Sequence, residues 1–306
     1  MTAPARLTAN QRGIVLMVAG MAGFALEDMF IKLLARRLPT GEILMVIGLA
    51  GAMLFAVAAR QRGLRFWSAG LLHRQVIGRN LGEMMGTFGY VLAIALSPLT
   101  TTTAIFQATP LAVTLGAALF LGEKVGWRRW TAIVVGFAGV MLVVRPGSAA
   151  FVPASLLALL AVVGLSARDL FTRRIPPRID SMLLAAWGFA SVGLVGVAEL
   201  AVTGDALMPS AVELAWLLGA LLCGAAGYWA LTEATRAGEI SVITPFRYSR
   251  LLFALLIGVT IFAERPDLWT LLGAALIVGS GLYSLVRERQ RARALRESLS
   301  PVTPAR

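Results

Sequence analysis

The chain has 306 residues, of which 58% are hydrophobic and 14% charged, and its mean hydropathy is +0.78. A soluble domain has about 45–50% apolar and about 25% charged residues, so this composition excludes an ordinary soluble protein. One cysteine and one histidine exclude a disulfide framework, a Cys/His zinc site and a c-type haem, and no cofactor or metal is expected. The composition therefore predicts an all-α integral membrane protein.

Apolar runs bounded by charges or turn residues predict ten transmembrane helices, because one span needs about 20 predominantly apolar residues. The connections between them are short and leave no room for a separate soluble domain. In chain order, the predicted helices are Gly13–Leu34, Glu42–Ala59, Arg74–Leu96, Thr101–Leu121, Trp127–Val144, Pro153–Ile175, Asp180–Val202, Val212–Thr235, Ser241–Phe262 and Leu268–Val286.

Basic residues are concentrated in alternate connections. The side with the two chain ends holds 20 Lys and Arg residues, and the other side holds only Arg36, Arg37, Arg145 and Arg265. Because cytoplasmic loops are enriched in Lys and Arg, both termini are predicted to be cytoplasmic, in the inner membrane of a cell. The net charge of +12 is thus mostly a topology signal, and it implies no nucleic-acid partner.

The two halves of the chain are related by a constant offset of 141 residues. It places Asp28-Met-Phe-Ile-Lys32 on Asp169-Leu-Phe-Thr-Arg173, Leu99-Thr100 on Ile240-Ser241, and Glu123 on Glu264. Because each half has five spans, an odd number, the second half must be inverted relative to the first. Inverted repeats are typical of secondary transporters, in which the substrate site lies near the midplane at the repeat interface.

The segments Ser97-Pro98-Leu99 and Leu121-Gly122-Glu123, with Pro110, Trp130 and Gly136, resemble the EamA-type repeat. Nearly all of residues 12–287 is similar to the EamA family of the drug/metabolite transporter superfamily. The segments 168–173 and 245–250 resemble a bacterial branch with S-adenosylmethionine-transporter-like members. The resemblance implies two inverted five-helix halves around a central cavity. The predicted organisation is a tail at 1–12, a first repeat at 13–146, a second repeat at 153–287 and a basic tail at 288–306.

Charged residues inside a membrane are costly, so each one is a candidate functional residue. Arg250 is predicted near mid-bilayer in the ninth span, and Arg247 lies one turn away on the same face, beside Tyr248. Two guanidinium groups could hold a carboxylate or phosphate of a substrate bidentately. At the 141 offset, Phe106 and Thr109 take their places, so the arginine pair is an asymmetry in a symmetric scaffold.

The third span offers a polar stripe that includes Arg79, Glu83 and Tyr90. Glu83 is deep enough to be desolvated and is the candidate for carrying a coupling proton. The alternatives are structural: Glu83 pairs with Arg79 at i−4, or the arginines of the ninth span pair with Glu83 or Glu233. Tyr90 is a candidate for substrate binding.

The first and sixth spans each contain an acid followed four residues later by a base. Because this spacing occurs in both halves, a structural role is predicted for two intrahelical pairs, Asp28 with Lys32 and Asp169 with Arg173. Glu27 has no acidic counterpart in the second half, because Arg168 takes that position. Glu27 and Arg168 are therefore candidates for the substrate site.

Four further positions complete the candidate set. Gln107 lies on a polar side of the fourth span, which Pro110 is expected to kink, either as a gate or as a packing bend. Trp229 in the eighth span could stack on an organic substrate, although packing is the commoner role of such a residue. Glu123 and Glu264 end spans and are expected to cap a helix or form ion pairs.

The leading hypothesis is a secondary active transporter of a small anionic or zwitterionic metabolite that works by alternating access. The alternatives are a proton-coupled exporter of cationic or amphipathic compounds, or a channel or scaffold protein. An enzyme is not expected, because the chain has no HExxH motif, no Walker A loop and no Asp-rich prenyltransferase motif. The expected partners are a small-molecule substrate and the lipid bilayer, and the chain is expected to be a monomer or loose homodimer.

Overall fold

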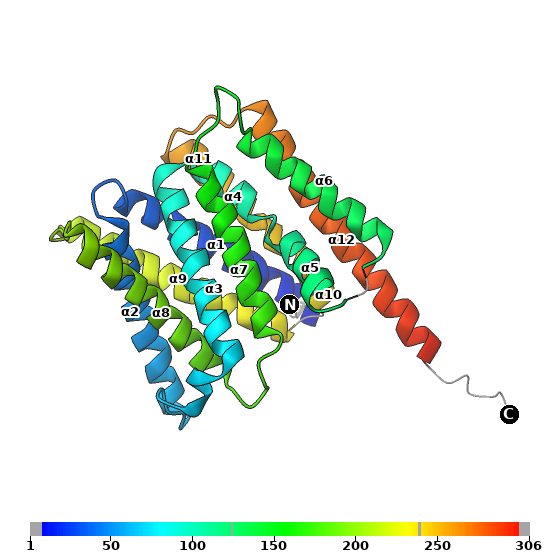
Figure 1. The fold of residues 1–306 in the computed structure, drawn as a ribbon, viewed down its shortest axis with the longest axis horizontal. Coiled ribbons are helices and arrows are strands. Elements are labelled where there is room, and N and C mark those ends of the chain that lie inside the picture. Colours follow the sequence, from blue (N-terminus) through cyan, green and yellow to red (C-terminus); the bar gives the residue numbers. More distant parts are fainter. Residues whose placement is uncertain (1–7, 124, 238–239, 300–306) are drawn as a thin grey trace, which may run out of the picture.

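The computed structural model describes residues 8–123, 125–237 and 240–299, and within them all regular structure is helical (Figure 1). The elements are α1 (Ala9–Leu34), α2 (Thr40–Gln61), η1 (Ala69–Leu72), α3 (Arg74–Leu96), α4 (Leu99–Phe106), α5 (Thr109–Phe120), α6 (Trp127–Val144), α7 (Ser155–Thr172), α8 (Ser181–Thr203), α9 (Ala211–Ala237), α10 (Ile240–Ile243), η2 (Thr244–Tyr248), α11 (Ser249–Ile261) and α12 (Leu268–Leu299).

Within the described ranges, eight helical segments are long and apolar enough to cross a membrane, with α4 and α5 counted as one segment. The two remaining predicted spans are also helical. α3 carries Arg74, Arg79 and Glu83, which lower its hydropathy, and it packs along the spanning helix α7. The ninth predicted span is divided among α10, η2 and α11. The all-α membrane fold predicted from the sequence is confirmed.

Two of the spans are broken, and the breaks fall at equivalent positions of the two halves. Gln107, between α4 and α5, corresponds at the 141 offset to Tyr248, the last residue of η2. Pro110 stands in the first turn of α5, where its missing N–H and its ring prevent a continuous helix, so the predicted kink is confirmed. The second break, which follows Pro245, was not predicted from the sequence.

The closest helix pairs are α1 with α9, α3 with α7, α2 with α8, and α6 with α12. A Cβ atom on Gly23 of α1 would lie 3.2 Å from the Cα of Gly227 in α9. One on Gly164 of α7 would lie 2.6 Å from the Cα of Gly86 in α3. The offset carries residue 23 to 164 and residue 86 to 227, so these are one contact made in both halves. Glycines permit this close backbone approach.

The helices group into two bundles that mix the halves of the chain. The α1 bundle consists of α1, α9, η2 and α11, and the α7 bundle consists of α3, α4, α5 and α7. The α2–α8 pair and the α6–α12 pair lie at opposite ends of the molecule (Figure 1). The repeat offset converts one bundle into the other.

The membrane-crossing helices define two faces of the molecule. α1 begins at the tail face, which also carries the α2–α3, α5–α6, α7–α8 and α9–α10 connections. The far face carries the α1–α2, α3–α4, α6–α7, α8–α9 and α11–α12 connections. A large apolar cluster is centred near the far face, around Leu34, Ile43, Ile94 and Leu99.

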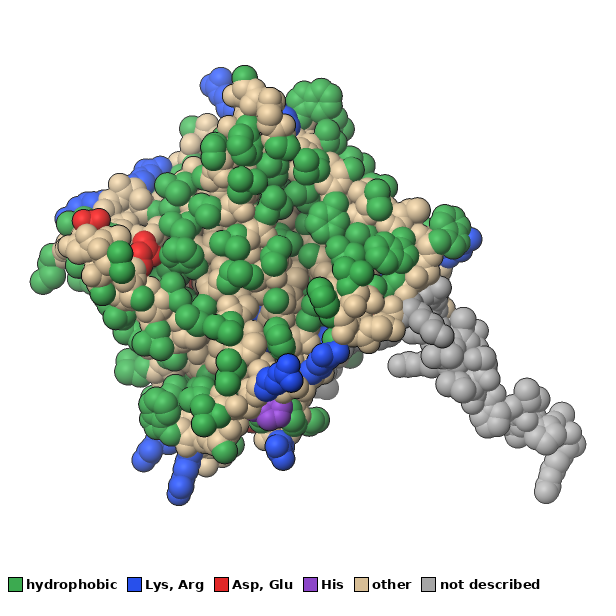
Figure 2. All heavy atoms as spheres, viewed as in Figure 1, with side chains coloured by type: hydrophobic (Ala, Val, Ile, Leu, Met, Phe, Trp, Pro, Cys, Tyr) green, Lys and Arg blue, Asp and Glu red, His purple; other side chains and the backbone are tan. Residues whose placement is uncertain are grey.

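The outer surface of the helices is apolar. Figure 2 shows hydrophobic side chains over most of the visible face and basic side chains at its margins. The most apolar windows of the spans are only 28–56% buried inside the protein, so many of their side chains point outward. Such an apolar belt is suited to a bilayer, where lipid covers the exposed side chains.

Candidate functional site

The middle of α1 holds a buried carboxylate that is bound by an arginine of the second half. Asp28 is 1% exposed, and Arg250 of α11 donates to it from Nε at 3.1 Å and from Nη2 at 2.7 and 2.8 Å. The hydroxyl of Tyr90 on α3 donates to the same carboxylate at 3.0 Å. Arg250 therefore holds a carboxylate as its residue type predicts, but this carboxylate belongs to the protein.

Aromatic rings enclose the guanidinium group of Arg250. The centroids of Phe106, Tyr90 and Phe24 lie 5.1, 5.2 and 5.3 Å from its Cζ atom. The negative faces of aromatic rings attract a cation, most strongly where water is excluded. The Asp28–Arg250 pair thus joins α1, α3, α4 and α11, which come from both bundles, through one shared charge contact.

A second ion cluster lies between α3 and α7. Glu83 accepts from Arg79 of its own helix at 3.1 Å and from Arg168 of α7, also at 3.1 Å. Arg168 in addition contacts Asp169 at 2.9 Å. The i−4 partner expected for Glu83 is therefore present, together with an interhelical arginine. Thr87 donates to the same carboxylate at 3.3 Å.

The predicted intrahelical pairs are not the pairs that the structure forms. Asp28 pairs with Arg250, and Asp169 pairs with Arg168. The two bases pair instead with glutamates that follow other helices. Lys32 Nζ lies 3.7 Å from Oε1 of Glu264, and Arg173 Nη1 lies 3.1 Å from Oε1 of Glu123. For Asp28 the reason is geometric. Arg250 binds its carboxylate through two nitrogens and Tyr90 adds a hydroxyl, whereas Lys32 on the same helix could offer only one ammonium group.

Arg247, on η2, differs from Arg250 in being solvent-exposed. In the described part of the chain, no hydrogen bond or ion pair holds its guanidinium group. Its charge is influenced by Asp169 and Arg168 of the second ion cluster and by Arg250 of the first. Asp169 and Arg168 themselves have side chains that are 36% and 28% exposed, so the rest of the protein leaves this region open.

Two of the predicted binding residues, Gln107 and Tyr248, occupy the break regions and are buried. Gln107 is buried, and its amide donates to the backbone carbonyl of Arg247 at 3.4 Å. Gln107 therefore links the break of the first half to that of the second. The buried Tyr248 hydroxyl lies against Gly281 of α12, so Tyr248 packs on a neighbouring helix.

Glu27 lies one residue before the buried Asp28 and points toward α9. A Cβ atom on Gly224 would lie 2.6 Å from Oε1 of Glu27, so the glycine makes room for this carboxylate. Its electrostatic partners are Asp28 and Arg250, and Arg250 is already bound by Asp28. Among the described residues, no hydrogen bond to the Glu27 carboxylate is formed. The negative charge of Glu27 inside the membrane region is thus only partly balanced by Arg250, which Asp28 already binds.

The sequence offers two aromatic residues of α9, Tyr228 and Trp229, and the one that faces the ion clusters is Tyr228. Trp229 is 61% exposed and shares an outward face with the exposed Leu218 and Leu222. Tyr228 packs edge-on against Phe55, with ring centroids 5.2 Å apart, and interacts electrostatically with the second ion cluster. The apolar i, i+4, i+11 spacing of the outward residues is a signal that could have assigned the two faces.

These residues provide two kinds of groups at the boundary between the bundles. Two ion clusters hold helices of the two halves together. Among the residues that the structure describes, Arg247 and Glu27 are left without a direct hydrogen-bonded partner. Arg247 on η2 and Glu27 on α1 offer a guanidinium and a carboxylate to groups of opposite charge. Within the described residues, no group of three or more His, Cys, Asp and Glu side chains is placed to hold a metal ion.

Comparison with protein families gives a match over both halves of the chain. The sequence profile of the EamA-like transporter family matches residues 11–145 and again residues 152–286. A protein known from a crystal structure has a similar fold, with a TM-score of 0.58 over 88% of this chain and 98% of that one, at 19% sequence identity.

Several curated proteins are similar in sequence. The chain is 29% identical over 215 residues to an S-adenosylmethionine uptake transporter of Rickettsia felis, which covers 69% of this chain and 71% of that protein. It is 33% identical over 215 residues to a riboflavin transporter of Rhizobium johnstonii, covering 68% of this chain and 69% of the relative. It is 26% identical over 271 residues to a pseudopaline exporter of Pseudomonas aeruginosa, covering 87% and 93%.

Proposed function

The chain belongs to the EamA-like transporter family, and from this premise we propose that it is a secondary active transporter of a small anionic or zwitterionic metabolite. The family and the names of the relatives point to a membrane transporter of small metabolites and not to an enzyme. The two repeats, at 13–146 and 153–287, carry the transport pathway between them, and both termini are cytoplasmic, with the chain in the inner membrane. The basic residues of the tail face support this orientation.

The observation that carries the proposal is the exposed Arg247, whose charge is influenced by both ion clusters. Arg250 is fully engaged by Asp28, so Arg247 is the midmembrane guanidinium that remains for a substrate carboxylate. It stands on η2, beside the break of the ninth span. Broken helices with functional groups at the break are a feature of transporter substrate sites.

Glu27 supplies the complementary charge. A substrate amine would compensate this carboxylate, just as a substrate carboxylate would compensate Arg247. A zwitterion satisfies both, and S-adenosylmethionine, named for several relatives, carries an amino-acid group of this kind. Arg168 and Tyr228 border the same region from α7 and α9, while Tyr90 and Gln107 support it through Asp28 and η2.

Alternating access follows from the two bundles. Each bundle is the inverted equivalent of the other, so tilting one against the other can close one face while opening the opposite face. The shared charge contact of Asp28, Arg250 and Tyr90 lies where the bundles meet and can act as the pivot. A single chain contains both bundles, so a monomer suffices for this cycle.

A second candidate is a proton-coupled exporter of cationic or amphipathic compounds. The contacts favour Glu27 over Glu83 as the proton carrier in that case. Glu83 is held by two arginines that stabilise its negative charge, whereas Glu27 has no direct basic partner among the described residues.

Thermal stabilisation of the purified protein tests the proposal. A ligand present at 100 times its dissociation constant stabilises the folded state by about 2.7 kcal/mol. We expect stabilisation by S-adenosylmethionine or simple amino acids that is lost in Arg247→Gln and in Glu27→Gln. It should persist in Arg287→Gln, a matched loss of an arginine at the end of the membrane-crossing part of α12.

Stabilisation by organic cations that survives Arg247→Gln but not Glu27→Gln would contradict the anion or zwitterion assignment and support the exporter. Counterflow in proteoliposomes separates a carrier from a channel. Preloaded substrate accelerates the entry of labelled substrate through a carrier, and no such acceleration occurs through a channel.

A further inference from the structure

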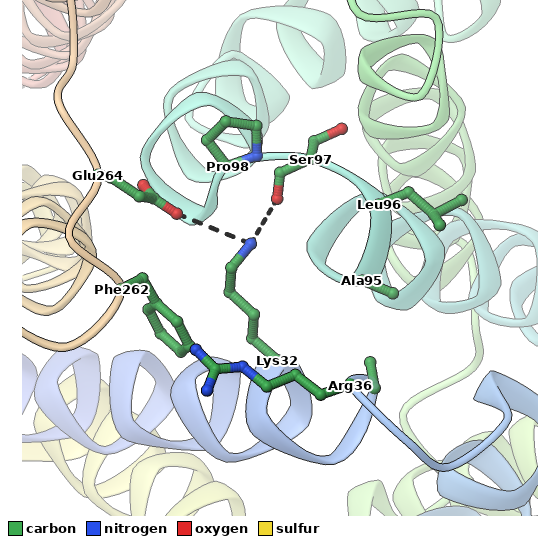
Figure 3. A pocket seen from close by; sticks show the side chains of 9 residues that line it. Lys32, Arg36, Ala95, Leu96, Ser97, Pro98, Phe262 and Glu264 are labelled. Carbon is green, nitrogen blue, oxygen red and sulfur yellow. Dashed lines mark hydrogen bonds and ion pairs between the residues drawn. The ribbon is translucent and has the colours of Figure 1, made fainter.

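A pocket of about 440 Å³ opens at the far face, between the end of α1, the α3–α4 connection and the α11–α12 connection. Figure 3 shows Lys32 rising from α1 into this pocket toward Glu264 and the carbonyl of Ser97. Phe262 lies beside them. Lys32 Nζ and Arg36 Cζ are each 5.4 Å from the centre of its ring. The pocket is therefore lined by charged groups of the α1 bundle on one side and by a helix connection of the α7 bundle on the other.

Lys32 and Glu264 together hold that connection. Lys32 Nζ donates to the carbonyl oxygens of Ile94 at 3.1 Å and Ser97 at 2.6 Å, at the end of α3. Glu264 accepts from the backbone N–H of Leu99 at 2.5 Å and of Thr100 at 3.0 Å, and from the Thr100 hydroxyl at 2.7 Å.

Each charge suits its position on the held connection. The ammonium group binds at a helix C-terminus, and the carboxylate binds at a helix N-terminus. The role expected for Glu264 as a helix cap is confirmed. Because Lys32 and Glu264 belong to the α1 bundle and the connection belongs to the α7 bundle, the five hydrogen bonds cross between the bundles. We call this arrangement the far clasp.

The repeat offset maps the far clasp onto a second pair at the tail face. Lys32 corresponds to Arg173 and Glu264 to Glu123, and these two residues form an ion pair at 3.1 Å. Arg173 follows α7 and Glu123 follows α5, so both belong to the α7 bundle. The connection equivalent to the one held by the far clasp is the α9–α10 connection of the α1 bundle, which lies partly outside the described residues. We call the Arg173–Glu123 pair the tail pair.

The backbone conformation just before Glu123 and just before Glu264 is the same in the two halves. Gly122 and Ala263 correspond at the offset, and both have left-handed φ angles, of 69° and 52°. In each case the following glutamate N–H bonds to a helix carbonyl six residues earlier: Glu123 to Ala117 at 3.2 Å and Glu264 to Gly258 at 2.8 Å. A non-glycine residue is strained in this conformation, so its presence at Ala263 indicates that the position of Glu264 matters.

We propose that the far clasp and the tail pair are the two gates of the transport cycle. This inference rests on the proposed function and adds to it the residues that decide which face opens. The far clasp seals the far face, with side chains only 16% and 10% exposed for Lys32 and Glu264. The tail pair is open to solvent, with side chains 51% and 45% exposed for Arg173 and Glu123. Breaking the far clasp releases the α3–α4 connection and favours a state open to the far face. The tail pair lies within the α7 bundle and is the open counterpart of the far clasp, so its loss disfavours closure of the tail face.

Accessibility of a midmembrane cysteine, measured without substrate, tests the gates. Arg247→Cys in a Cys223→Ala background places a single thiol at the exposed position of η2, beside the break of the ninth span. Its reaction with a membrane-impermeant, positively charged methanethiosulfonate is followed in vesicles of each orientation. The variants are Lys32→Met for the far clasp and Arg173→Met for the tail pair. Arg145→Met is the matched control, because it removes a far-face ion pair with Asp267 at 2.5 Å that joins α6 to α12 and touches neither bundle.

We expect Lys32→Met to increase labelling from the far face, and Arg173→Met from the tail face, each by about fivefold or more, while Arg145→Met changes neither. Glu264→Ala should act like Lys32→Met, because it removes three of the five hydrogen bonds of the far clasp. This second variant keeps the test valid if Lys32→Met does not fold. Equal increases from both faces, or no change in any variant, would overturn the gate assignment. Side-specific labelling combined with absent ligand binding by the wild-type protein would instead contradict the proposed substrate.

Discussion

The Asp28–Arg250 pair provides a direct test of how the two halves are held together. Replacing Asp28 by Asn preserves the size of the side chain but leaves the guanidinium group without its counter-charge. Arg250 then remains buried among three aromatic rings, with one neutral acceptor in place of a bidentate carboxylate. Its positive charge cannot reach water without moving α11.

The expected loss is large for a single substitution. Removing one partner of a buried ion pair costs about 3–5 kcal/mol, because the other charge is left uncompensated. With roughly 2–4 °C per kcal/mol for a large domain, the apparent melting temperature should fall by about 6–20 °C. The double variant Asp28→Asn with Arg250→Met should recover much of this loss, because it removes both charges and fills the aromatic site with an apolar side chain.

Asp169 offers a matched control at the repeat-equivalent position. Its side chain is 36% exposed, and its partner Arg168 keeps Glu83 as a second acid. Asp169→Asn should therefore cost only about 0–1 kcal/mol. The assay is thermal unfolding of detergent-purified protein followed by intrinsic fluorescence. If Asp28→Asn costs no more than Asp169→Asn, then Glu27 has taken over Arg250, and the reasoning that Arg250 is committed to Asp28 is refuted.

Three further predictions concern the backbone and the far face. Ala263→Gly should raise the melting temperature slightly, because relief of about 1–2 kcal/mol of left-handed strain exceeds the added unfolded-state entropy of about 0.4–1 kcal/mol; a lower melting temperature would contradict this. Gly164→Ala should cost about 1–3 kcal/mol, because its Cβ would strike the backbone of α3, whereas Gly279→Ala, which meets nothing within 4 Å, should be neutral in the same melt. The pKa of Asp267 lies below its ordinary value, chiefly because the backbone N–H of Thr270 donates to it at 2.9 Å. Its small stabilisation should be complete above about pH 4 and lost on further acidification, and melts of Asp267→Asn should lack this component.

Local pattern in the sequence was sufficient for the fold. Apolar length located the spans, and a constant offset located the inverted halves, because both signals depend only on distance along the chain. Pro110 marked the first helix break for the same reason. The second break follows Pro245. Pro245 is also visible in the sequence, but it is not equivalent to Pro110 at the offset of 141. The repeat therefore gave no reason to expect a break there.

The ion partners could not be found in this way. Spacing along one helix suggested Asp28 with Lys32, whereas the actual partner of Asp28 is 222 residues away. That choice depends on α1 lying beside α11, which no local spacing encodes. The same limit explains Trp229: a helix face is assigned by what packs against it, and the glycines that contact α1 lie on the face of α9 opposite the exposed leucines.

The two halves carry residues of the same charge at the proposed gates but different residues at the centre of the membrane. This difference distinguishes the control of access from the binding of substrate. Lys32 and Glu264 have counterparts of the same charge in Arg173 and Glu123, because each half must close one face by the same movement. Arg247 corresponds to Phe106, so the two halves present different chemistry to the middle of the membrane. A substrate needs one binding site that both faces share, and a symmetric site would present the same charge twice. We therefore propose that the asymmetric centre selects the substrate and that the symmetric ends control its access.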